Sequence, residues 1–127
     1  MTSTFAIHAD RLDVVAAAEA VGVSRDTVLA AIDRLDAAVI AIDGTGFEPT
    51  PFGPQSRLAN ALDLQGAELW VKDETGNVSG SHKGRHLFGV ALGMALAGDA
   101  PDRLAIASCG NAAFAASVIA GAIERPL

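Results

Sequence analysis

The chain has 127 residues, of which 50% are hydrophobic and 19% charged, so intrinsic disorder is not expected. Its formal net charge of −6 gives no support for a nucleic-acid or anionic-membrane partner. The single cysteine, Cys109, excludes an internal disulfide and a cysteine-based zinc cluster. The N-terminal residues lack the pattern of a signal peptide, and no apolar run approaches the ~20 residues that span a bilayer. We therefore expect a cytoplasmic globular chain.

The first third of the sequence predicts helices. Asp10 can cap a helix over residues 11–21, and a glycine ends it. Ser24 can cap a second helix, from residue 25 to about 42, by accepting a hydrogen bond from an unpaired backbone amide. Apolar residues recur along this second helix at 3.6-residue spacing: Val28, Leu29, Ile32, Leu35, Val39 and Ile42. Residues 1–46 are expected to form a helical N-terminal extension.

Glycine and proline concentrate between residues 44 and 54, which indicates an extended connector. The elements expected after it are a short helix over 57–64, a strand over 67–72, a helix over 81–97, a strand over 103–107 and a helix over 111–124. The β-α-β-α order predicts a parallel sheet with helices on its faces. The expected fold class is α/β, a partial three-layer parallel-sheet domain preceded by the helical extension.

Two loops of small residues each follow a predicted strand and open a helix. The first is Gly80-Ser81-His82-Lys83, and the second is Ser108-Cys109-Gly110-Asn111. A lysine that forms a Schiff base must lose its proton, which a helix start and partial burial both favour. Unpaired amides at the second helix start can bind a carboxylate. Because ligands bind at the carboxyl ends of parallel strands, we expect the two loops to converge on one crevice.

The residues of these loops also resemble a known family. The run Trp-Val-Lys-Asp-Glu-Thr-Gly-Asn-Val-Ser-Gly-Ser-His-Lys-Gly-Arg, residues 70–85, resembles the cofactor-lysine segment of fold-type II pyridoxal-phosphate enzymes. That family includes threonine synthase, serine/threonine dehydratase, cysteine synthase and the tryptophan synthase β subunit. Residues 108–113 resemble its Ser-x-Gly-Asn loop, and Pro49-Thr50-Pro51 resembles its Thr-Pro-Leu segment. The three landmarks occur in the family's order and approximate spacing.

The resemblance implies pyridoxal 5'-phosphate as the cofactor and a small amino acid as the substrate. Lys83 would hold the cofactor as a Schiff base and act as the catalytic base, and Asn111 would bind the cofactor's ring hydroxyl. Ser108 and the amides of Asn111, Ala112 and Ala113 would receive the substrate carboxylate. The implied chemistry is α-proton abstraction with β-elimination or replacement, as in a threonine/serine dehydratase or a threonine synthase.

The chain departs from the family in two respects. His82 stands where phenylalanine is usual, which leaves the choice between the lyase and synthase branches open. The family's Gly-rich phosphate loop and the residue that faces the ring nitrogen lie well downstream, and neither is found in this sequence. We therefore expect residues 47–127 to be the N-terminal part of a pyridoxal-phosphate-binding α/β domain, inactive alone. Its partner would be a second copy or the remainder of the enzyme.

Other interpretations of the same residues remain open. Lys83 can be a solvated lysine, and residues 108–111 can be a simple strand-to-helix turn. The chain would then be a non-catalytic binding or interaction module that retains half of the fold. Glu74 is expected at a solvated strand end, with the alternative that it orders the lysine loop. His82 and His86 are four residues apart on one helix face, but with no further ligand we expect no metal site.

A third interpretation is a helix-turn-helix DNA-binding regulator, because residues 16–29 resemble that motif. The span from Asp10 to Asp43 holds three arginines against seven acidic residues. The resulting excess of negative charge would repel the phosphates of DNA, whereas a DNA-binding surface attracts them and releases their counterions. We therefore expect no nucleic-acid partner.

Overall fold

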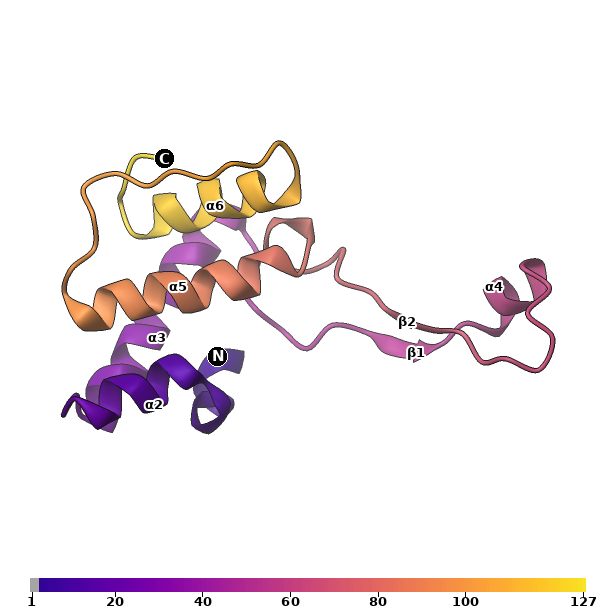
Figure 1. Cartoon of the computed structure of the whole chain (residues 1–127), viewed down its shortest axis with the longest axis horizontal. Coiled ribbons are helices and arrows are strands. Elements are labelled where there is room, and N and C mark those ends of the chain that lie inside the picture. The colour runs from indigo at the N-terminus through magenta and orange to yellow at the C-terminus, as the bar shows by residue number, and fades with distance from the viewer. Residues whose placement is uncertain (1–2) are drawn as a thin grey trace.

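The structure is a computed structural model that describes residues 3–127. It consists of a helical body and an arm that stands away from the body (Figure 1). The body contains helices α1 (Thr4–Ile7), α2 (Asp13–Ala20), α3 (Arg25–Asp43), α5 (Lys83–Ala97) and α6 (Asn111–Ala122), and the short 3-10 helices η1 (Ala9–Arg11) and η2 (Val78–Gly80). The arm carries β1 (Phe52–Pro54), α4 (Ser56–Ala61) and β2 (Trp70–Lys72).

Helix α3 begins where the sequence predicts and ends one residue beyond Ile42, at Asp43. Ser24 Oγ accepts a hydrogen bond from the Thr27 amide at 3.3 Å, and Gly44 ends the helix in the left-handed region, with a φ of 79°. Helix α2 begins later than predicted, because residues 9–11 form η1 and Asp10 lies within this turn instead of capping α2.

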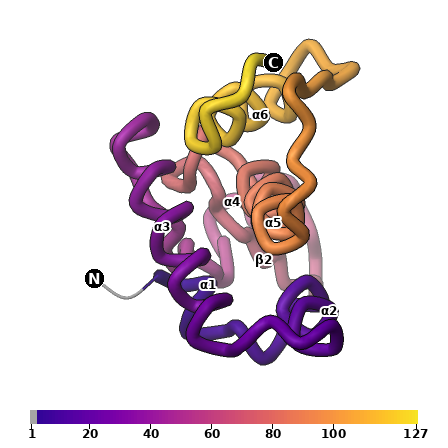
Figure 2. The backbone as a smooth tube through the Cα atoms, turned by 90° about the vertical axis from the view of Figure 1, so that its left-hand side faces the viewer, coloured from indigo at the N-terminus to yellow at the C-terminus, as the bar shows by residue number. Residues whose placement is uncertain are grey.

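The body has one continuous apolar core that draws on both ends of the chain. Helix α3 packs against α5 and α6, and α2 packs against α5; Figure 2 shows these four helices around a common centre. Phe88 of α5 is fully buried and stacks on Phe5 of α1, with 4.2 Å between ring centroids. Phe47 meets both rings edge-on. Residues 3–46 therefore share their core with the helices that follow the two loops.

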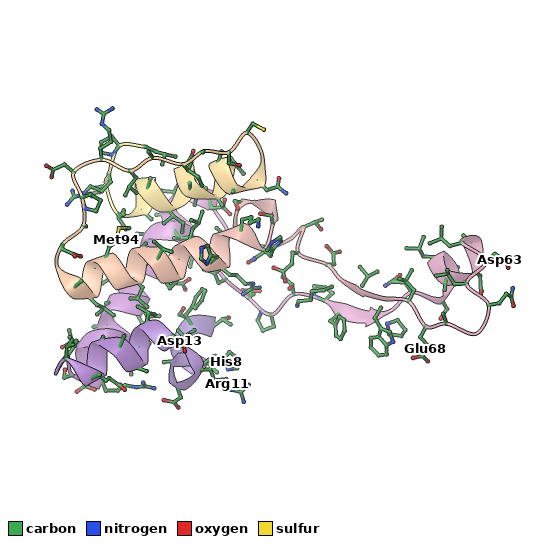
Figure 3. The ribbon with its side chains drawn as sticks, viewed as in Figure 1. His8, Arg11, Asp13, Asp63, Glu68 and Met94 are labelled. Atoms are coloured by element: carbon green, nitrogen blue, oxygen red, sulfur yellow. The ribbon has the colours of Figure 1, made fainter. Side chains whose placement is uncertain are left out.

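The sheet differs from the parallel sheet that the sequence predicts. Strands β1 and β2 pair in antiparallel register, with Phe52 opposite Lys72 and Pro54 opposite Trp70. Within residues 3–127 this two-stranded sheet is the only one. Most side chains of the arm are exposed, and Figure 3 labels Asp63 and Glu68 near its far end. The chain thus combines helices with a small sheet, and the described residues form no parallel strand pair.

The predicted strand over residues 103–107 is not formed. This segment is irregular. It connects the end of α5 to the start of α6, and on the way it passes alongside α6 (Figure 1). The Leu104 amide donates to the Pro126 carbonyl at 2.9 Å. A strand needs a neighbouring strand along its length to pair its backbone groups, and the described residues offer this segment only that one backbone bond.

Among residues 3–127, no helix combines the length and apolar composition needed to cross a membrane.

Candidate functional site

Lys83 is the first residue of α5, as its loop pattern predicts to within two residues. Its backbone amide donates to Ser81 Oγ at 3.3 Å. The side chain is exposed, so the helix start is present and the expected partial burial is not. Within residues 3–127, its amine makes no hydrogen bond or ion pair. The structure thus presents Lys83 as an unengaged amine at a helix start.

The backbone that leads to Lys83 is held tightly. Ser79 in η2 is buried and has a φ of 58°, in the left-handed region. Its amide donates at 3.1 Å to Oδ1 of Asp43, the last residue of α3. A Cβ placed on Gly84 would lie 3.2 Å from the Val78 carbonyl oxygen, so any larger residue would push η2 away from the start of α5 by a few tenths of an ångström. The backbone of Lys83 is fixed although its side chain is free.

Glu74 is the centre of a polar network beneath this loop. Its side chain is 16% exposed, and its carboxylate accepts from the Thr50 hydroxyl, from Asn77 Nδ2 at 2.9 Å and from Arg85 Nε at 3.2 Å. Burial alone would raise the pKa of Glu74. The hydrogen bonds from Thr50 and Arg85, with the charges of Arg85 and Lys72, outweigh burial and hold that pKa below its ordinary value.

The network also clamps the connector that precedes the arm. Arg85 Nη2 donates to the Glu48 carbonyl at 2.7 Å, and Lys72 Nζ donates to the Thr50 carbonyl at 2.5 Å. These contacts join the Pro49-Thr50-Pro51 landmark to both sides of the lysine loop. They favour the interpretation in which Glu74 orders that loop. The sequence does not indicate Thr50 as a partner of Glu74, because 24 positions separate the two residues.

The second loop has open hydrogen-bonding groups at the start of α6. Asn111 is the first residue of α6, and both it and Ser108 are exposed. Ser108 Oγ accepts from the Gly110 amide at 3.4 Å, and the Ala113 amide donates to the Gly110 carbonyl at 2.9 Å. The amides of Asn111 and Ala112 have no acceptor within residues 3–127. Of the three amides expected to bind a carboxylate, two are therefore available and that of Ala113 is engaged.

The two loops lie at the same end of the body. Helices α5 and α6 run in the same direction, and both begin at the end from which the arm extends (Figure 1). Helix η2, which leads to Lys83, packs against α6. The structure therefore brings the lysine loop next to the helix that the Ser108–Asn111 loop opens.

The helix-turn-helix interpretation has Ser24 and Thr27 open a recognition helix, and Arg25 lies between them. In the structure Arg25 pairs with Asp10 and, at 3.0 Å, with Glu19. One of the three arginines of this region is thus already neutralised by two carboxylates.

No group of three potential metal-ligating side chains lies together in the part of the chain that the structure describes.

Comparisons with protein-family models, with curated proteins and with solved structures find no match for this chain. The family resemblance therefore depends on the three sequence landmarks, and the site on the geometry of the two loops.

Proposed function

We propose that this chain provides the lysine-bearing part of a pyridoxal-phosphate-dependent enzyme of fold type II. The enzyme would act on a small amino acid by α-proton abstraction and β-elimination or replacement, like a threonine/serine dehydratase or a threonine synthase. The observation that carries the proposal is the meeting of the lysine loop with α6, whose first amides are unpaired.

The residues present fit the lysine side of such a site. Lys83 offers an exposed amine on a fixed backbone. The start of α6 offers the amides of Asn111 and Ala112, and Ser108, in the loop three residues before Asn111, adds a hydroxyl. Amine, unpaired amides and hydroxyl are the groups needed to hold an aldehyde cofactor and an amino-acid carboxylate.

Each side chain would have a distinct task. When bound, pyridoxal phosphate supplies an electron sink for the substrate's α-carbon. Lys83 would hold the cofactor and later take up the α-proton at Nζ. The amides of Asn111 and Ala112 would bind the carboxylate, because the start of a helix favours an anion. The Asn111 side chain would orient the cofactor's ring hydroxyl, and Glu74 would keep the lysine loop in place.

The proposal also requires further strands, from a second copy or from the remainder of an enzyme. Residues 103–107 leave most of their backbone groups without a strand partner, and such groups readily pair with another strand. The arm exposes Phe52 and Trp70, whose ring centroids lie 5.3 Å apart. Assembly would complete a parallel sheet beside α5 and α6 and give the expected three-layer α/β arrangement.

Selective chemical trapping tests the proposal. The chain has two lysines, Lys72 and Lys83. Pyridoxal phosphate is added, the product is reduced with borohydride, and the modified peptides are mapped by mass spectrometry. We expect labelling of Lys83 in preference to Lys72, because Lys72 donates to the Thr50 carbonyl and lies 3.5 Å from Glu74. The Lys83→Ala variant should lose this label.

Unfolding the chain in urea provides the internal control, since both lysines should then react alike. Equal labelling of Lys72 and Lys83 in the folded chain would contradict the proposal. It would leave the chain as the non-catalytic module that the sequence also allows.

A further inference from the structure

A separate cavity lies between α1, α3 and the connector over residues 44–49. Its volume is about 430 Å³, within the ~300–1,000 Å³ range of small-molecule sites. Apolar side chains form much of its lining, namely those of Ile7, Ile40, Phe47 and Pro49. Neither Lys83 nor Asn111 lines it, so it is distinct from the site proposed above.

Two buried polar groups line this apolar cavity. Asp36 of α3 is 8% exposed and Ser3 is 4% exposed, and both line it. Within residues 3–127, neither Asp36 Oδ1 nor Ser3 Oγ has a hydrogen-bond partner. Buried polar groups are normally paired, and leaving them unpaired costs free energy.

The surroundings of Asp36 do not compensate its carboxylate fully. Burial raises the pKa of Asp36, and the charge of Asp33 acts in the same direction. The Ser3 hydroxyl and the Phe47 amide lie near enough to oppose burial in part, yet Oδ1 remains without a bond. Asp36 Oδ1 can therefore accept a hydrogen bond from a molecule that enters the cavity.

We propose that this cavity binds a small molecule with a primary ammonium group on an apolar body. Asp36 Oδ1 and Ser3 Oγ would accept its N–H groups, and charge-assisted bonds to a carboxylate are the stronger kind. Ile7, Ile40 and Phe47 would contact the apolar body. An anion is disfavoured, because Asp36 and Glu48 both line the cavity.

The connector that lines this cavity also takes part in the network beneath the lysine loop. Glu48 and Pro49 line the cavity, and the Glu48 carbonyl accepts from Arg85 at 2.7 Å. The next residue, Thr50, donates to Glu74. The connector thus contacts both the cavity and the network beneath Lys83.

Amide chemical shifts in ¹⁵N-labelled protein test the proposal, with isobutylamine as the probe and isobutanol as its uncharged counterpart. We expect isobutylamine to shift the Gly44 and Gly46 amides, which line the cavity, in a saturable manner. Asp36→Asn should weaken this binding about tenfold (~1.4 kcal/mol), because asparagine keeps an acceptor oxygen but loses the charge that strengthens the bond to an ammonium group. Asp26→Asn, an exposed change on the same helix, should leave it unchanged.

A second variant keeps the test decisive if Asp36→Asn alters the fold. Ile7 is 63% exposed, so Ile7→Ala should fold normally and weaken isobutylamine binding by removing apolar contact. Isobutanol should bind more weakly than isobutylamine to the unmodified chain. Non-saturable shifts, equal binding of the two probes, or unchanged binding by a folded Asp36→Asn variant would each overturn the proposal.

Discussion

Replacing Glu74 with glutamine removes the charge beneath the lysine loop and keeps the shape of the side chain. Thr50 donates to Oε1, whereas Asn77 and Arg85 donate to Oε2 at 2.9 and 3.2 Å. Glutamine has one oxygen, and its –NH₂ group is a donor. With its –NH₂ group at the Oε2 position, the variant loses the bonds from Asn77 and Arg85. With that group toward the Thr50 hydroxyl, which can also accept, it keeps the contacts but loses the charge that pairs with Arg85.

The expected loss is about 2 kcal/mol in the free energy of unfolding. Hydrogen bonds to charged groups contribute roughly 1.5–3 kcal/mol, and the side-chain exposures of 28% for Arg85 and 16% for Glu74 favour the lower half of that range. Lys72 is 47% exposed, so its pair with Glu74 adds little. Because the pKa of folded Glu74 is lowered, this contribution is present above the ordinary pKa of glutamate. It is lost as pH falls through the folded pKa.

Urea unfolding followed by far-UV circular dichroism measures this difference, with Glu68→Gln as the matched control. Glu68 lies exposed on the arm and accepts from the Trp70 indole at 3.2 Å, so its replacement should leave the transition unchanged. At pH 7 Glu74→Gln should unfold at lower urea than the unmodified chain, and the gap should close in acid. If Glu74→Gln had the same urea midpoint as the unmodified chain at pH 7, the stabilising role of the network would be refuted. A difference between the two midpoints that persisted in acid would refute it too.

Three further substitutions test other parts of the structure. Gly84→Ala should lower the free energy of unfolding by about 1–3 kcal/mol through overpacking against η2. A Cβ on Gly89 would have nothing within 4 Å, so Gly89→Ala should raise that free energy by about 0.5–1 kcal/mol. Urea midpoints in the opposite order would contradict the packing of Gly84 against η2. Phe88→Ala should cost about 3–5 kcal/mol and Phe114→Ala, at an exposed position, far less; equal losses in thermal unfolding would be inconsistent with the aromatic core. Because the pKa of folded Asp36 is raised, the unmodified chain loses stability as pH rises through that pKa, so Asp36→Asn should be more stable at pH 7 and lack this slope. Parallel stability–pH curves for the two proteins would show that Asp36 is not buried as described.

The helices could be predicted because their signals are local. The Ser24 cap and the apolar spacing of α3 lie within a few turns. The structure confirms the cap, and it buries Val28, Ile32, Leu35 and Val39 but leaves Ile42, at the end of the helix, 50% exposed. Helix α6 begins at Asn111 as predicted. Helix α5 begins at Lys83 instead of residue 81, because Ser81 is extended, with a φ of −159°. The sequence thus located both helix starts of the candidate site to within two residues.

The features that the sequence did not reveal depend on contacts between distant residues. The composition of residues 103–107 suits a strand, but a strand also needs a neighbouring strand to pair with. Thr50 meets Glu74 only because the connector folds back on the lysine loop. Asp36 resembles the other acidic residues of its helix in sequence, yet the chain around Ser3 and Phe47 covers it. Each outcome depends on tertiary packing, which local patterns do not encode.

The concentration dependence of trapping at Lys83 tests the proposed function most directly. In a cofactor site, Lys83 should reach half-maximal labelling at a lower pyridoxal-phosphate concentration than Lys72. Asn111→Ala should raise that concentration about tenfold, the effect of one lost hydrogen bond. Asn60→Ala, an exposed change on the arm, should not alter it. Identical concentration curves for Lys83 and Lys72, insensitive to Asn111→Ala, would show that Lys83 is only a solvated amine and would contradict the proposed function.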